Sequence, residues 1–340
     1  MSSTMTLSSV PSAALEIAEV SPEAARSLKS LLEDASLTIP SIEAVASTLQ
    51  TSVSQAAHAS HEIAASIEHI LHFKDLPQWM QIDPYIQQGY RRQLDSFRAC
   101  FWSLFYTHNE LVNTWSHLLP AFFYLALLLG TDYSVFLGGA KVSTPDNLAF
   151  QTYVAGTAGC LLLSAFFHAT NAHSEDVVRR FLKLDYLGIT LSISVTCISS
   201  TYFGLYGDPT LQALYITMTV ICASAVFRAV LDPEMDGPAA AGWRAVLFIA
   251  LAGSGFTPVG HKAVTDGVDS LQGFPLFSLM LMSLSYLVGT VIYITHVPEK
   301  YWPGRFDIWG ASHQIFHFMV AVGQVVYLLG LKEVLQMHYL

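Results

Sequence analysis

Long apolar runs separated by short polar breaks fill the chain after residue 110. A helix needs about 20 mostly apolar residues to cross a lipid bilayer. The runs that are long enough number seven, and they are Trp115–Leu137, Phe150–Thr170, Leu184–Leu205, Leu211–Leu231, Trp243–Val259, Phe274–Val297 and Ala311–Leu331. The fifth run contains Gly253, Gly255 and Pro258, which interrupt a regular helix. The pattern predicts an all-α fold, a bundle of seven transmembrane helices whose fifth member is the least regular.

Basic residues are distributed unevenly between the two ends of these runs. On the side that faces the N-terminus, ten Lys and Arg residues flank the runs: Arg91, Arg92, Arg98, Arg179, Arg180, Lys183, Arg228, Arg244, Lys300 and Arg305. The opposite side has three: Lys141, Lys262 and Lys332. Lys and Arg collect in cytoplasmic loops. We therefore predict a multi-pass protein of the plasma membrane or an endomembrane, with a cytoplasmic N-terminus and an extracellular or luminal C-terminus.

The composition supports a membrane protein and excludes some other classes. Hydrophobic residues make up 52% of the chain and charged residues only 12%, against about 25% charged residues in soluble domains. The net charge of -10 provides no basic face for phosphate contacts, so nucleic acid is not an expected partner. The four cysteines show no CxxC pairing and indicate neither a disulfide framework nor a zinc–thiolate site.

The chain changes character near residue 110 and is predicted to have three parts. Residues 1–20 are expected to be a disordered tail without a secretory signal, since they lack a basic start and an apolar core. Residues 21–110 are expected to form a cytoplasmic N-terminal region that is partly helical, because Pro22-Glu23-Ala24 and Ile42-Glu43-Ala44 resemble helix starts. Residues 111–340 form the seven-helix domain.

Five polar residues stand out inside the apolar runs. Ser164 and His168 lie four residues apart in the second run, Asp185 opens the third, and His313 and His317 lie four apart in the seventh. Residues four apart share one face of a helix. With the orientation given above, all five lie near the cytoplasmic ends of their helices. Ionisable groups inside a membrane are costly and by default mark a functional site.

Three imidazoles that converge at one depth are typical of a metal site. Three histidines with an open fourth position are a common donor set of catalytic zinc, so the seven-helix domain is predicted to bind zinc through His168, His313 and His317. One alternative is that each histidine only forms hydrogen bonds between helices. A histidine cluster without metal is another alternative, but it would leave several polar groups poorly paired in an apolar environment.

A further polar set lies at the start of the first run. Glu110, Asn113 and His117 recur at helical spacing and share one face. They could form a second polar site, but we favour hydrogen bonding at the start of the helix, where it meets the membrane interface.

These motifs together resemble the progestin and adiponectin receptor family and the related bacterial hemolysin III proteins. The resemblance extends from about Leu76 to the C-terminus, and its character is near that of the fungal branch. It depends on His108-Asn109-Glu110 with Trp115-Ser116-His117, on Ser164-Ala165-Phe166-Phe167-His168 with Asp185-Tyr186, and on Ser312-His313-Gln314-Ile315-Phe316-His317. The N-terminal tail is unlike that of the animal receptors, so hormone binding is not carried over.

The resemblance implies roles for individual residues. It implies that His168, His313 and His317 are zinc ligands, that Asp185 holds a zinc-bound water, and that Ser164 is a nearby site residue. Arg244 resembles an arginine that meets the polar end of a bound fatty acid.

The function implied is zinc-dependent hydrolysis of a lipid amide, with ceramide as the substrate and a fatty acid and a sphingoid base as products, in lipid or zinc homeostasis. The expected partners are membrane lipids, ceramide or free fatty acid. A second hypothesis is a receptor with structural zinc and an unknown extracellular ligand. Transport of metal or protons is a third hypothesis, and it is less favoured because the charged groups gather at one face.

Overall fold

The computed structural model describes residues 47–48, 50–55, 70–130, 142–235 and 238–339. The chain divides into two compact units, Met1–Glu68 and His69–Leu340. In the first unit the described residues are helical and exposed. The tail expected to be disordered, residues 1–20, lies outside the described residues.

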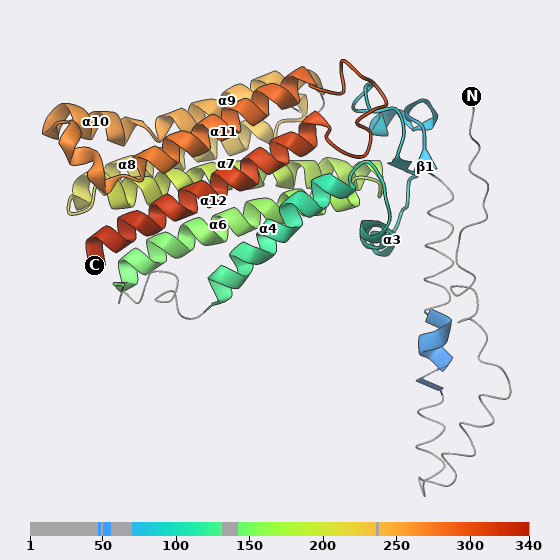
Figure 1. Cartoon of the computed structure of the whole chain (residues 1–340), viewed down its shortest axis with the longest axis horizontal. Coiled ribbons are helices and arrows are strands. Elements are labelled where there is room, and N and C mark those ends of the chain that lie inside the picture. Colours follow the sequence, from blue (N-terminus) through green and yellow to red (C-terminus); the bar gives the residue numbers. More distant parts are fainter. Residues whose placement is uncertain (1–46, 49, 56–69, 131–141, 236–237, 340) are drawn as a thin grey trace, which may run out of the picture. The chain divides into compact units, whose positions relative to one another are not determined.

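The second unit contains the seven-helix bundle (Figure 1). Within the described residues, seven helical segments are long and apolar enough to cross a membrane. They are α4 (Leu111–Leu129), α6 (Thr144–Thr170), α7 (Glu175–Gly204), α8 (Pro209–Val230), α9 with α10 (Ala241–Ser254 and Thr257–Asp266), α11 (Leu276–Thr295) and α12 (Ser312–Tyr339). Short 3-10 helices lie between them: η6 (Pro233–Met235), η7 (Pro238–Ala240) and η8 (Val268–Gly273). The predicted all-α architecture with seven spans is confirmed.

Several helices extend beyond the apolar runs that predicted them. The helix α7 begins at Glu175 rather than at Leu184, because Glu175 and Asp176 in its first turn favour the helix N-terminus and Arg179 pairs with Glu175. Hydropathy therefore marks the apolar part of a helix, whereas polar turns continue it. At the other extreme, α4 ends at Leu129 with Gly130 as its C-cap, short of the expected Leu137. Residues 131–141 lie outside the described residues.

The fifth span is broken, as its glycines predicted. The helix α9 ends at Ser254, and α10 starts two residues beyond Gly255, with Pro258 in its first turn. Gly255 packs directly against α7, since a Cβ atom there would lie 2.5 Å from Sγ of Cys197. The break is therefore a site of close helix contact as well as a helix interruption.

The core of the bundle lies where α4, α6, α7, α11 and α12 meet. Tyr124, Tyr153 and Tyr327, from three of these helices, are fully buried there. The helices α6 and α7 approach closely, because a Cβ at Gly188 would lie 3.1 Å from Cα of Cys160. This approach fixes the relative position of two helices that bear predicted site residues.

Residues 70–110, which we call the lead-in, fold against the end of the bundle where α12 begins (Figure 1). The lead-in contains a two-stranded antiparallel sheet, β1 (Ile70–Leu71) and β2 (Tyr90–Arg91), with Ile70 opposite Arg91. Its other elements are η3 (Phe73–Asp75), η4 (Gln78–Met80), α3 (Phe97–Trp102) and η5 (Ser103–Phe105).

Hydrogen bonds fasten the lead-in to the segment before α12. The carboxylate of Asp307 accepts from the backbone amides of Gln87 and Gln88 at 2.9 and 3.0 Å. The side-chain amide of Gln314, in the first turn of α12, lies 3.5 Å from the carbonyl oxygen of Asn109. The lead-in is thus continuous with the end of the bundle that contains the histidines.

Candidate metal centre

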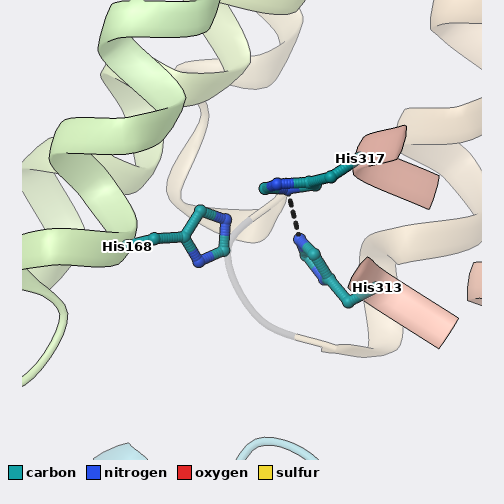
Figure 2. A group of neighbouring side chains, drawn as sticks. All are labelled: His168, His313 and His317. Atoms are coloured by element: carbon teal, nitrogen blue, oxygen red, sulfur yellow. Dashed lines mark hydrogen bonds between the residues drawn. The ribbon is translucent and has the colours of Figure 1, made fainter. Parts of the chain in front are cut away.

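The three histidines come together from two helices (Figure 2). His168 lies in the last turn of α6, and His313 and His317 lie in the first two turns of α12. One ring nitrogen from each lies within 4.8 Å of the other two. His168 and His317 are each only 2% exposed, and His313 is half-buried. The predicted convergence of these residues on one point is confirmed.

In His168 and His317, Nδ1 points away from the centre of the group and forms a hydrogen bond there. This hydrogen bond determines which nitrogen of each ring is free to bind a metal. Nδ1 of His168 lies 2.7 Å from Oε2 of Glu110, and Nδ1 of His317 lies 3.0 Å from the carbonyl oxygen of Asn113. A carboxylate and a carbonyl accept hydrogen bonds, so both Nδ1 atoms donate. Each ring, when neutral, therefore carries its lone pair on Nε2.

The inner nitrogens then provide the donor set for a cation. Nε2 of His168 is buried and has no hydrogen-bond partner within the described part of the chain. Nε2 of His317 faces Nε2 of His313 at 3.0 Å (Figure 2). A buried polar atom without a partner is costly, and imidazole ligands of metals are commonly held at their other nitrogen by a carboxylate or carbonyl. These residues therefore fit a metal ion bound by three imidazoles.

Burial and neighbouring charges act together on the groups that hold His168. Burial alone would raise the pKa of Glu110, but its contact with His168 reverses the effect and holds the pKa below its usual value. Glu110 is thus a carboxylate that accepts from His168. Burial lowers the pKa of neighbouring His108 to about 2, so that His108 is neutral and its Nδ1 accepts from the backbone amide of Glu110.

Asp185 and Ser164 lie beside the histidine group. Ser164, one turn before His168 on α6, is buried, and its hydroxyl lies 2.9 Å from Nδ1 of His117. Asp185, on α7, is half-buried, and its carboxyl is near enough to Ser164 and His168 for both to influence it. The structure thus brings a carboxylate and a hydroxyl near the histidine group, and general acid–base hydrolysis uses groups of this kind. Their catalytic roles stay predictions.

Arg244 is buried near the same end of the bundle. Its guanidinium lies over the ring of Tyr186, 4.7 Å from the ring centre, and Nη1 donates to the carbonyl oxygen of Met235 at 2.6 Å. Tyr186 follows Asp185 directly on α7. Arg244 is thus anchored against α7 through Tyr186, and its role towards a fatty acid stays a prediction.

The polar face at the start of α4 belongs to this site. Glu110 and Asn113 contact His168 and His317, and the ring of His117 stacks on that of His317 with 3.7 Å between centres and 4° between planes. The hydroxyl of Ser116 lies 3.1 Å from Nδ1 of His317. The face is thus neither a separate site nor only part of the membrane interface. In the sequence, the helical spacing of these residues was the feature that could have indicated their place in the site.

Arg91 is the other residue whose role the sequence did not reveal. It was counted only among the basic residues that set the orientation. Its side chain is 2% exposed and donates to the carbonyl oxygens of His168 and Ala169, both at 2.8 Å, and to Oγ of Ser103 at 2.7 Å. The lead-in thereby holds the end of α6 at the residue that carries the first imidazole.

A second group within the described residues also has potential metal-ligand atoms within 4.8 Å of one another. It consists of Asp83, His296 and Glu299. The Glu299 carboxylate already accepts from the backbone amide and the hydroxyl of Ser312, and Asp83 pairs with Nδ1 of His296 at 3.0 Å. Both carboxylates have partners within the protein, so the group is explained as a support for the start of α12.

Comparisons with known proteins identify the family of this chain. The family model described as haemolysin-III related matches residues 105–328. An adiponectin receptor protein of Drosophila melanogaster is 34% identical over 265 residues, which cover 78% of this chain and 59% of the fly protein. A progestin and adipoQ receptor-like protein of Caenorhabditis elegans is 35% identical over 267 residues, covering 78% of this chain and 60% of the relative.

A fungal relative is covered more completely. An ADIPOR-like receptor of Saccharomyces cerevisiae is 33% identical over 266 residues, which are 78% of this chain and 84% of the yeast protein. By contrast, the chain matches less than two thirds of the length of the fly and worm proteins. The family model includes all three histidines and Asp185 within its range. This chain is a multi-pass integral membrane protein of the haemolysin-III-related family, to which progestin and adipoQ receptors also belong.

Proposed function

We propose that this protein is a zinc-dependent membrane hydrolase that cleaves the amide bond of a lipid such as ceramide. The proposal rests on the buried Nε2 of His168, which has no hydrogen-bond partner among the described residues and faces the imidazoles of His313 and His317. The Asp185 carboxyl is near enough to His168 to be influenced by it. Three imidazoles with a neighbouring carboxylate are typical of hydrolytic zinc sites.

A bound zinc ion would supply Lewis acidity and lower the pKa of water towards neutrality. The residues of the chain do the rest. The Asp185 carboxylate takes a proton from the attacking water, whose oxygen forms a bond to the amide carbon. The Ser164 hydroxyl, next to Asp185, donates to the oxygen that gains negative charge. As the carbon–nitrogen bond breaks, Asp185 returns the proton to the leaving nitrogen, so that a fatty acid and an amine result.

The position of the site in the bundle supports a lipid substrate. His168, His313 and His317 lie within one or two turns of the ends of their spans, near the depth at which the amide of a sphingolipid meets the acyl chains. Arg244 is proposed to hold the carboxylate of the released fatty acid. The excess of Lys and Arg at this end of the bundle supports a cytoplasmic N-terminus and a site that faces the cytoplasm.

The experiment measures zinc content and fatty-acid release from ceramides with purified protein. Asp185→Asn should keep its zinc and lose at least about 100-fold in turnover, because it removes a general base. Glu175→Gln, an exposed substitution in the first turn of the same helix, is the matched control and should change neither. An Asp185→Asn protein with zinc and full turnover would contradict the proposed role.

A receptor with structural zinc is the second candidate, and the names of the fly, worm and yeast relatives favour it. In this function the metal would join α6 to α12, and an extracellular ligand would alter their packing. Zinc removal would then lower the melting temperature, and the pure protein would release no fatty acid from any ceramide. Detectable, zinc-dependent release would decide for the hydrolase.

A further inference from the structure

We infer that Glu110 is a positioning residue of the metal centre, which fixes the orientation and the tautomer of the His168 ring. The inference rests on the metal site of the proposed function and adds a residue for which the motifs alone indicated no such role. Glu110 precedes α4, a helix that contributes none of the three imidazoles.

The contact is short and reinforced. Oε2 of Glu110 lies 2.7 Å from Nδ1 of His168, and the side-chain amide of Asn113 donates to the same oxygen at 2.7 Å. His168 is almost fully buried, so water does not compete for its Nδ1. The carboxylate is therefore held from one side by Asn113 and holds the imidazole on the other.

This contact has a direct consequence for metal binding. An imidazole can turn over about its χ2 bond and can carry its proton on either nitrogen. A carboxylate at Nδ1 selects the one state in which Nε2 faces the other two histidines with its lone pair. Without it, the ring would populate states that present a carbon or a proton to the metal.

The alternative role, capping of α4, does not account for the carboxylate. Glu110 occupies the N-cap position, but its side chain accepts no hydrogen bond from the amides of the first turn of α4. The side chain points instead to His168 on α6. A side-chain oxygen that caps the helix would accept from the backbone amide two or three residues further on, whereas the Glu110 carboxylate accepts only from the side-chain amide of Asn113 on α4.

The same turn of α4 also orients the second helix of the site. The carbonyl oxygen of Asn113 accepts from Nδ1 of His317 at 3.0 Å, and the Ser116 hydroxyl lies 3.1 Å from the same atom. One helix start thus sets rings from both α6 and α12. Glu110 provides the only charged group among these contacts in the described residues.

Three variants distinguish positioning from capping. Glu110→Gln keeps the length of the side chain and an oxygen that accepts from Nδ1. Glu110→Asp keeps the charge and is a strong N-cap residue, but it is one methylene too short to maintain the contact. Glu110→Ala removes both properties. Positioning predicts that zinc affinity falls in the order wild type, Gln, Asp, Ala, whereas capping or charge alone predicts that Asp exceeds Gln.

The measurements are chelator competition for zinc and the visible absorption spectrum of the cobalt(II)-substituted protein in detergent. We expect Glu110→Ala and Glu110→Asp to weaken zinc binding about 10- to 100-fold, as for other residues that orient a metal-bound histidine. The cobalt spectrum should change in both and stay near wild type in Glu110→Gln. Glu175→Gln is the matched surface control and should leave affinity and spectrum unchanged.

The outcomes separate this inference from the proposed function. A wild-type protein that binds no zinc would overturn both. The positioning role alone would be overturned by a different result. In that result the wild-type protein binds zinc, and Glu110→Asp binds zinc at least as tightly as Glu110→Gln. Should Glu110→Ala fail to fold, the comparison of Asp with Gln still decides, since both keep a polar group at the helix start.

Discussion

The two ends of the bundle both contain buried polar clusters, but they are built differently. At the end where α6 begins and α12 finishes, Asp146 is 1% exposed and accepts from three tyrosine hydroxyls: Tyr202 at 2.7 Å, Tyr206 at 3.1 Å, and Tyr339. Its two oxygens are both in use. At the histidine end, no described residue forms a hydrogen bond with Nε2 of His168, although polar groups surround it.

This difference separates a structural cluster from a site. Around Asp146 the hydrogen bonds join α6, α12 and the end of α7, and every oxygen of the carboxylate is satisfied within the protein. Around His168 the outer nitrogen is satisfied and the inner one is not. Buried polar groups are generally paired, so an unpaired nitrogen that faces two further imidazoles could hold a metal ion.

The largest effect is expected from removal of a ligand at the histidine end. His317→Ala takes away one of three metal donors, and the protein should lose more than about 100-fold in zinc affinity, beyond the effect of changing an orienting residue. Metal analysis after dialysis against a weak chelator measures it. Full zinc retention by His317→Ala would show that the unpaired nitrogen does not mark a metal site.

The next effect is expected at Arg91, which supports the same end without touching the inner nitrogens. Arg91→Leu removes buried hydrogen bonds to the carbonyl oxygens of His168 and Ala169, and the protein should lose about 3 kcal/mol of stability. Thermal unfolding of the metal-free protein in detergent measures the loss. Arg92→Leu, a neighbouring exposed arginine, is the matched control. Equal melting temperatures for the two variants would contradict the proposed support.

The smallest effect is expected at the tyrosine end. Asp146→Asn keeps the shape of the side chain but replaces one accepting oxygen by a donor, so about 1–2 kcal/mol should be lost. Zinc affinity should stay that of the wild type, because the cluster lies at the opposite end of α6 from His168. A change in zinc affinity would remove the distinction between the two ends.

Much of this structure was predictable because the membrane imposes strong rules on the sequence. Hydropathy located the seven helices, and the spacing of His313 and His317 showed two donors on one face. Gly253, Gly255 and Pro258 predicted the broken fifth span. The polar extension of α7 to Glu175 was missed, since hydropathy does not register polar turns that continue a helix beyond the apolar run.

The contacts that support the histidines could not be predicted from the sequence, for a different reason. Glu110 and His168 are 58 residues apart, and their contact depends on how α4 packs against α6. Arg91 and His168 are 77 residues apart, and an arginine before a first span normally indicates only membrane orientation. Local patterns identify the candidate ligands, whereas the residues that orient them become visible only when the helices are assembled.

The lead-in has a consequence for the energetics of metal capture. Its bonds to the end of α6 and to the segment before α12 hold both helices in place through protein contacts alone. The protein would then lose little conformational entropy on binding a metal ion. Less of the coordination free energy would be spent on ordering the protein, so the affinity would be higher. Such a preorganised centre should exchange its ion without unfolding, in contrast to small domains that fold only around their metal.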